Sequence, residues 1–95
     1  MAIVYNNNKV SVAATSTEVL PAVEGKRIIA TLTNDSNETI YLGFNEAAVL
    51  NEGTPLAPAE TLTIEEKDRL NVVINAISTS GTKNLAFTDI YLTEV

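Results

Sequence analysis

The chain has 95 residues, of which 45% are hydrophobic, so it can form one domain with a modest core. Its formal net charge of −6 disfavours binding to nucleic-acid phosphates, which carry the same sign. The absence of cysteine and histidine removes disulfides, thiolate metal ligands and the usual general base of an enzyme. No apolar run reaches transmembrane length and no signal peptide is visible. We therefore expect a protein that is made and used in a cytosolic setting, or released by lysis, without membrane contact.

Strand patterns run along almost the whole chain. Val, Thr, Ile and Asn dominate, and apolar and polar residues alternate with a period of two, which is typical of half-buried strands. Residues 1–8 contain a polar Asn tract and form a possible N-terminal arm. Strands are predicted at 9–14, with 18–20 as an extension past a kink, and at 26–33, 39–44, 61–64, 71–77 and 84–94.

The segment 26–44 predicts an antiparallel hairpin. Its two strands flank residues 34–38, which are dense in Asn, Asp and Ser, the side chains that favour tight turns. In the first strand Ile29 falls on the mostly polar face, which suggests partial cover from a neighbouring element or chain. A long loop at 45–60 follows, in which residues 46–50 could form one helical turn.

The last predicted strand changes its inward face along its length. Leu85 and Phe87 share one face, whereas Ile90 and Leu92 are in the opposite phase. Because a slip of one residue moves side chains to the other face, we predict a β-bulge near Thr88–Asp89.

These elements define a fold class. Short strands with turns every 8–12 residues or so are typical of sandwiches and small barrels. We therefore predict an all-β fold: a single small antiparallel β-sandwich or barrel over residues 1–95, with roughly six to eight short strands. Jelly-roll-like and immunoglobulin-like topologies both fit this pattern.

The chain is poorly supplied with groups for catalysis or metal binding. Its densest carboxylates, at 65–68, fall in a charged turn and are expected to be a solvated face. Oxygen-bearing side chains at 34–38 would suit a hard cation such as calcium, but their spacing does not match an EF-hand loop and a turn explains them. We expect no catalytic residue, no cofactor and no metal site.

The chain has more residues suited to contact with a partner protein than to catalysis. Tyr41 and Tyr91 are the aromatic residues that could face outward, either packing across strands or serving as a sugar platform. The apolar chain ends either pair within the sheet or reach a neighbouring subunit by strand addition. The candidate partner-contact residues are Ile3, Val4, Tyr5, Ile29, Tyr41, Glu46, Val49, Leu50, Pro55 and Tyr91.

Three segments in fixed order resemble a known family. They are RIIATLTNDSNETIYLGF, NEGTPLAPAETLTI and NAISTSGTKNLAFT. Over residues 26–88 they resemble the small β-sandwich modules of tailed-bacteriophage structural proteins, in which a tNnS…iYlG hairpin precedes a G-x-x-L-x-P-G/A-E loop and an aIs-x-s-G-T segment. Ala59 stands where that pattern often has glycine. The residues that carry the resemblance are Asn34, Gly43, Gly53, Pro58 and Gly81.

The resemblance implies a virion role. The favoured implied role is that of a capsid decoration, or cement, protein, which is not an enzyme. It would bind the major capsid protein or another virion protein and stabilise the assembled head. Such a protein is assembled in the host cytoplasm and is a homo-oligomer, with a trimer favoured by analogy. The loop at 45–60 and the N-terminal segment would be its contact elements. The alternatives are a head-fibre, neck or tail component, and a glycan- or host-surface-binding module.

Overall fold

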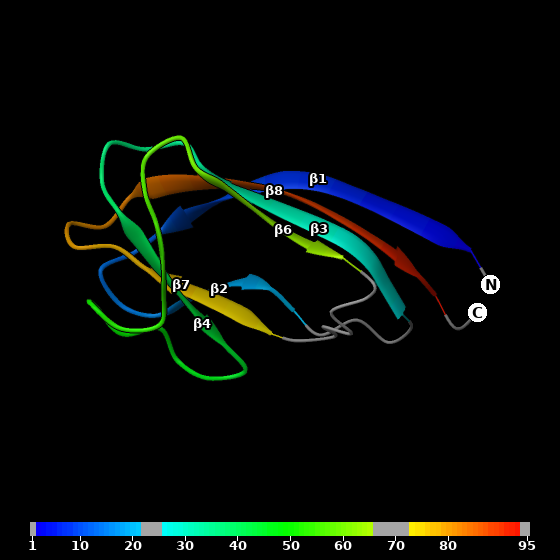
Figure 1. Ribbon diagram of the computed structural model, residues 1–95, viewed down its shortest axis with the longest axis horizontal. Coiled ribbons are helices and arrows are strands. Elements are labelled where there is room, and N and C mark those ends of the chain that lie inside the picture. The colour runs from blue at the N-terminus through cyan, green and yellow to red at the C-terminus, as the bar shows by residue number, and fades with distance from the viewer. Residues whose placement is uncertain (1, 22–25, 66–72, 94–95) are drawn as a thin grey trace.

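The computed structural model describes residues 2–21, 26–65 and 73–93. Within these ranges the chain forms two antiparallel four-stranded sheets that pack together, so the predicted all-β sandwich is confirmed (Figure 1). Sheet A has the order β1-β8-β3-β6 and sheet B the order β2-β7-β4-β5. The strands are β1 (Ile3–Val12), β2 (Thr17–Leu20), β3 (Lys26–Asn34), β4 (Ile40–Phe44), β5 (Thr54–Leu56), β6 (Thr61–Glu65), β7 (Ile74–Ile77) and β8 (Lys83–Leu92).

The core lies between the inner faces of the two sheets. Alternation within each strand sends every second side chain inward, and most of the buried side chains are aliphatic. Leu42 of sheet B and Phe87 of sheet A are both buried in this layer, as their phase in the sequence predicts. The buried cluster comprises Val12, Val19, Leu20, Ala30, Leu32, Ile40, Leu42, Leu56, Ile64, Ile74, Ala76, Leu85 and Phe87.

The two sheets differ in length, and this difference sets the shape of the molecule. β1 and β8 each span 10 residues, whereas the longest strand of sheet B, β4, spans 5. Figure 1 shows β1, β3 and β8 running past the described strands of sheet B toward the chain ends. We call that end the terminal end. We call the opposite end, where the turns and loops gather, the loop end.

The predicted hairpin at 26–44 is wrong. β3 lies in sheet A, where it pairs with β6 and β8, and β4 lies in sheet B, where it pairs with β5 and β7. The Asx-rich segment between them does reverse the chain, but it carries the chain from one sheet to the other. Turn chemistry specifies such a reversal and leaves the choice of partner strand to the packing of the faces.

The predicted bulge near Thr88–Asp89 is also misplaced. β8 pairs with β1 without any shift of register, and Asp89 continues the inward phase of Phe87 with only 2% of its surface exposed. The register shift lies instead in β3, between Arg27 and Ile29. The sequence argument assumed that only apolar residues turn inward, and here an acidic residue does so beside a basic partner.

Several predicted segments have different bounds in the structure. Residues 3–8, expected as an arm, belong to β1 and pair with β8 along their length. Residues 18–20 lie in β2, in the other sheet, and therefore do not extend the first strand. The loop at 45–60 contains the short strand β5, and residues 46–50 form no helical turn. Of the charged turn predicted at 65–69, only Glu65 lies within the described residues, at the end of β6.

Candidate functional site

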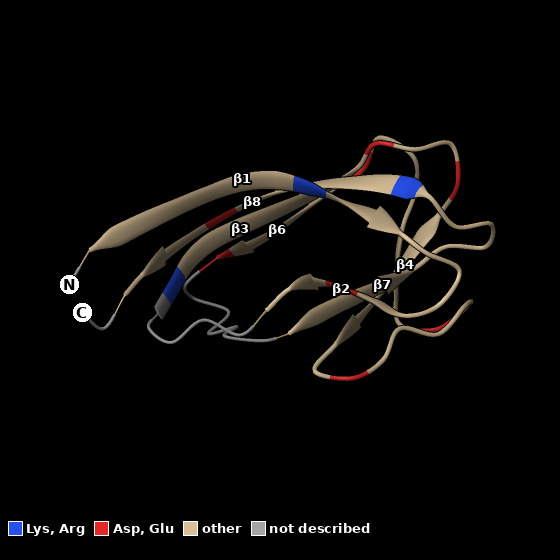
Figure 2. Ribbon diagram, turned by 180° about the vertical axis from the view of Figure 1, so that it is seen from behind, with Lys and Arg blue, Asp and Glu red and all other residues tan. Residues whose placement is uncertain are grey.

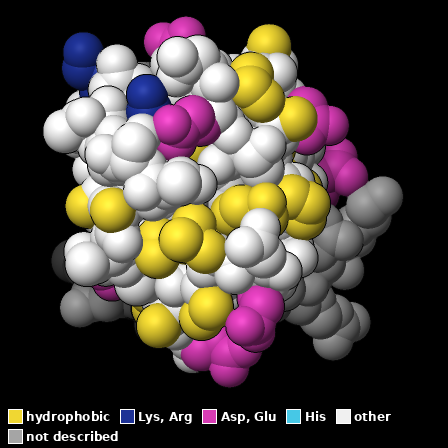
Figure 3. Space-filling view, turned by 90° about the vertical axis from the view of Figure 1, so that its left-hand side faces the viewer, with side chains coloured by type: hydrophobic (Ala, Val, Ile, Leu, Met, Phe, Trp, Pro, Cys, Tyr) yellow, Lys and Arg dark blue, Asp and Glu magenta, His cyan; other side chains and the backbone are white. Residues whose placement is uncertain are grey.

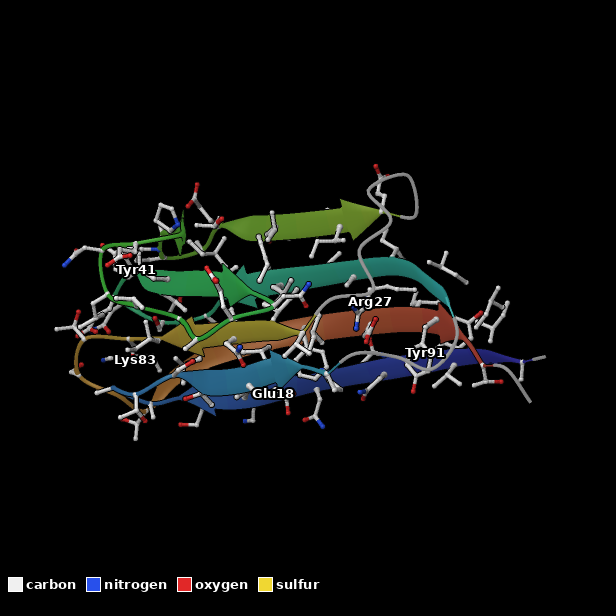
Figure 4. All side chains as sticks on the ribbon, turned by 90° about the horizontal axis from the view of Figure 1, so that it is seen from below. Glu18, Arg27, Tyr41, Lys83 and Tyr91 are labelled. Carbon is white, nitrogen blue, oxygen red and sulfur yellow. The ribbon has the colours of Figure 1, made fainter. Side chains whose placement is uncertain are left out.

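The predicted contact residues lie at opposite ends of the molecule. Figure 4 labels Tyr41 and Tyr91, which are far apart along the strands. They therefore belong to two candidate surfaces rather than to one site. The terminal end holds Ile3, Val4, Tyr5, Ile29 and Tyr91, and the loop end holds Tyr41, Glu46, Val49, Leu50 and Pro55.

The terminal residues are divided between the two faces of sheet A. Val4 and Tyr91 are direct partners across β1 and β8, and Tyr91 also pairs with Arg27 of β3, so the three share the inner face. Ile3 and Tyr5 alternate with Val4 and lie on the outer face, where 51% and 66% of their surfaces are exposed. The ring of Tyr91 is therefore not presented on the outer face.

A buried ion pair lies on the inner face at the terminal end. Arg27 donates through Nε to Oδ1 of Asp89 at 2.8 Å and through Nη2 to Oδ2 at 3.0 Å, a two-pronged contact. Nη2 also donates to the carbonyl oxygen of Pro21 at 2.9 Å. The two side chains are only 2% and 3% exposed. The pair thus ties β3, β8 and the end of β2 together beyond the main aliphatic core (Figure 4).

The outer face of sheet A is apolar near the chain ends and polar farther along. Tyr5, Ile90 and Ile29 are consecutive partners across β1, β8 and β3, so their side chains form one row. Ile29 and Ile90 are half-buried within that row. The next row toward the loop end consists of Asn7, Thr88, Thr31 and Thr63.

The segment 45–53, which runs from the end of β4 to the start of β5, is anchored through its backbone. The N–H of Asn45 donates to the carbonyl oxygen of Val73 at 2.8 Å, and Oδ1 of Asn45 accepts from the N–H of Val73 at 3.0 Å. The carbonyl of Glu46 accepts from Nδ2 of Asn75 at 2.8 Å, and the N–H of Ala48 donates to Oγ of Ser16 at 2.9 Å. A loop with so many fixed points is pre-organised, even though it has no regular secondary structure.

This anchored loop carries exposed apolar side chains. Val49 has 48% of its surface exposed, while Leu50 beside it is half-buried. Figure 3, which looks onto the loop end, shows apolar side chains spread across this face with acidic side chains beside them. Seven exposed residues between 45 and 60 make up what we call the loop-end surface. They are Glu46, Ala47, Val49, Glu52, Pro55, Pro58 and Ala59.

Asn34 holds the base of the loop end together. Its Nδ2 donates to the carbonyl oxygens of Glu38 at 2.6 Å and Leu56 at 2.7 Å, and its Oδ1 accepts from Oγ of Ser36 at 2.6 Å. All the hydrogen-bonding capacity of this fully buried amide is therefore engaged except one lone pair. The residue that signals a turn in the sequence is here a bridge between the two sheets.

Two tight turns complete the loop end. Glu60 N–H donates to the carbonyl of Ala57 at 3.0 Å, with Pro58 second and Ala59 third in the turn at a φ of 69°. This pattern fits a type II turn, whose third position favours glycine. Gly53 has a φ of 77°, and a Cβ there would lie 2.4 Å from the carbonyl oxygen of Leu42. Residues of the phage-like motif thus shape this end of the scaffold.

One hollow beside the anchored loop is small for a ligand site. The hollow between β4 and the anchored loop, lined in part by Glu46, Val49 and Glu52, holds about 80 Å³. Sites for small ligands usually measure roughly 300–1,000 Å³. Tyr41 is half-buried nearby, and its hydroxyl contacts Oδ1 of Asn51 at 3.1 Å. Neither feature favours a sugar platform.

The basic residues of the described chain do not form a patch, and Figure 2 shows them lying apart from one another. Within the described ranges no three His, Cys, Asp or Glu side chains are grouped as a metal site, and no helix there could span a bilayer. Ser80 donates a 2.6 Å hydrogen bond to Glu38, and this bond, assisted by the charge of Lys83, lowers the pKa of Glu38. The side chain of Glu38 is 30% exposed, and its carboxylate is engaged by the neighbouring Ser80 and Lys83.

Some of these residues could have been found from the sequence. Asp89 alternates with Leu85 and Phe87, so a strict period of two already places a carboxylate inward and calls for a basic partner. Its partner Arg27 gives no such signal, because the bulge in β3 changes its phase. Ile90 was taken as a core residue and instead lies on the outer face.

Comparison with known proteins returns no match. No protein-family model fits the chain, no curated protein resembles it at a significant level, and no solved structure does so. The resemblance to phage modules therefore rests on the sequence motifs alone.

Proposed function

We propose that this protein is a structural component of a tailed-phage virion, most simply a decoration protein that binds the assembled head through its loop-end surface. Catalysis has no part in this role. The protein would bridge neighbouring capsid subunits and would stabilise the shell by mass action, because it binds only the assembled form.

The anchored loop is the observation that carries the proposal. Backbone groups of this loop form hydrogen bonds with Val73, Asn75 and Ser16. The side chain of Val49, by contrast, is 48% exposed to solvent. Pre-organisation lowers the ordering cost of binding, and an exposed apolar side chain on a fixed loop is a typical anchor for a partner protein. A hollow of about 80 Å³ suits contact with a surface better than enclosure of a small ligand.

The motif residues support the same proposal. Asn34, Gly53 and the turn at 57–60 all serve to build the loop end. The part of the chain that resembles phage modules is therefore the part that holds the proposed docking surface in shape.

The first test is the abundance of the chain in purified particles, measured by quantitative mass spectrometry against the major capsid protein. Decoration predicts a ratio near one to one or another simple lattice fraction. A few copies per particle would shift the role to head fibre, neck or tail. Absence from particles would overturn the virion proposal and favour a free binding module.

A second test locates the surface. Purified chain is added to heads that lack it, and binding is measured by co-sedimentation. We expect Val49→Asp to weaken binding at least tenfold, because it places a charge in the apolar contact. Thr63→Asp, which changes an exposed residue on the outer face of sheet A, is the matched control and should bind normally. Equal loss in both variants would contradict the assignment of the surface.

A further inference from the structure

The four sheet edges of this protein are not equally protected. β6, β2 and β5 span 5, 4 and 3 residues, and β5 contains Pro55. β1 spans 10 residues, and no described strand pairs with its free side. Proteins usually shield long edges with prolines, bulges or charges, because an open edge can pair with another strand. Residues 3–7 of β1 contain none of these devices.

The register with β8 shows which backbone groups point to the free edge. Thr93 N–H donates to the carbonyl oxygen of Ala2 at 2.9 Å, so Ala2 belongs to a hydrogen-bonded pair. Hydrogen-bonded and non-bonded pairs alternate along an antiparallel ladder. The even-numbered residues of β1 therefore bond β8. Ile3, Tyr5 and Asn7 direct their N–H and C=O groups away from it.

The open part of this edge has a defined end. The N–H of Lys9, which should also point outward, donates to Oδ1 of Asn8 at 2.8 Å. That donor is thereby occupied within the chain. The stretch available for pairing is thus 3–7, and Tyr5 is its midpoint.

We propose that a second copy of this chain occupies the edge, with β1 of the two copies antiparallel about a twofold axis at Tyr5. Tyr5 then pairs with Tyr5 of the partner subunit, and Ile3 pairs with Asn7 of the partner subunit. Each pairing exchanges two backbone hydrogen bonds, and every outward donor of 3–7 is used. The two A sheets become one continuous sheet.

The side chains fit this twofold register. Tyr5 is 66% exposed and begins the row that continues through Ile90 and Ile29. The axis joins that row to its copy, so the two tyrosine rings pack against each other and against the adjoining isoleucines. Moving the axis to Asn7 would require the N–H of Lys9, which Asn8 already holds. Self-complementarity at one edge is what an isologous dimer needs.

This inference does not depend on the proposed function. The test is the mass of the full chain in solution, measured by sedimentation equilibrium over a range of concentrations. We expect the native chain to form dimers and Tyr5→Lys to raise the dissociation constant at least tenfold, because like charges would face each other. Ser11→Lys, on the same strand beyond the paired stretch, is the control and should dimerise normally.

A cross-link tests the register. The chain has no cysteine, so a single introduced thiol reports only contacts of its own position. Paired Cα atoms about 5.5 Å apart lie within the range of a disulfide. Tyr5→Cys should therefore give a covalent dimer on oxidation, whereas Lys9→Cys should not. A native chain that is monomeric at about 1 mM, a trimer, or equal cross-linking of both variants would each overturn the proposal.

Discussion

The two ends of the sandwich bury polar groups in different ways. At the loop end, neutral side chains such as Asn34 and Ser78 bond backbone groups of neighbouring segments. At the terminal end, the charged Arg27 and Asp89 bond each other between strands that extend past sheet B. Both arrangements link segments that lie far apart in the sequence, by 22 positions from Asn34 to Leu56 and by 62 from Arg27 to Asp89. Only the second brings two opposite charges together, on side chains that are 2% and 3% exposed.

Each end is therefore vulnerable to a different kind of substitution. A neutral amide that loses its partners leaves carbonyl groups unsatisfied, a moderate cost. A buried ion that loses its counter-ion leaves a full charge in a medium of low polarity, a larger cost. The terminal end should therefore respond more strongly to single substitutions, and the loop end should respond according to turn geometry.

The largest effect is expected at Arg27. Arg27→Met leaves Asp89 buried without its counter-ion and should lower the free energy of unfolding by about 3–5 kcal/mol. Chemical denaturation with urea measures this change. The double variant Arg27→Met with Asp89→Leu should recover most of the loss, because both charges are then absent. A double variant as unstable as the single one would show that the cost lies in packing rather than in charge.

A moderate effect is expected at Asn34. Asn34→Leu removes the donor to the carbonyls of Glu38 and Leu56, and each unsatisfied carbonyl should cost roughly 1–3 kcal/mol. Asn37→Ala, in the same connection but exposed, should change stability by less than about 0.5 kcal/mol. Comparable losses at both positions in thermal unfolding would contradict the bridging role of Asn34.

A gain is expected at Ala59. Its φ of 69° lies in the left-handed region, which costs a residue with a Cβ about 1–2 kcal/mol. Glycine relieves that strain but adds about 0.4–1 kcal/mol of chain entropy in the unfolded state. Ala59→Gly should therefore stabilise the protein by about 0.5–1 kcal/mol. Ala47→Gly, on the same surface, should destabilise it instead, and a loss at Ala59 would argue against the type II turn.

The smallest effect is a pH dependence at Glu38. The hydrogen bond from Ser80 lowers the pKa of Glu38 below its ordinary value of 4.5. A lowered folded-state pKa means that the stabilisation is present above pH 4.5 and is lost as pH falls through the folded-state value. The melting temperature of Glu38→Gln should therefore differ from that of the native chain more at pH 7 than at pH 3. A constant difference across this range would exclude the ionised carboxylate as its source.

The sequence predicted the fold class well and the pairing of strands poorly. Alternation identifies strands and places Leu42 and Phe87 in the core, because burial acts on each strand separately. It does not decide which strands become neighbours, and so β3 and β4 were expected in one sheet. The placement of Asp89 was missed because its burial depends on Arg27, a residue 62 positions away.

The sequence named candidate contact residues but not their arrangement in space. Tyr5 and Val49 were named for their apolar character in polar surroundings, and both are exposed in the structure. Their separation at opposite ends depends on the strand order, which the sequence pattern leaves open.

The adjacency of the two chain ends has a mechanical consequence. β1 and β8 are antiparallel neighbours, and Ala2 and Thr93 are hydrogen-bonded at their outer limit. A force applied between these two residues would open the ladder from that limit, loading one hydrogen-bonded pair at a time. A force applied between Ala2 and the loop end would load the same pairs together, in shear. The sandwich should therefore unzip easily when held by both ends of its chain and resist a pull along its length.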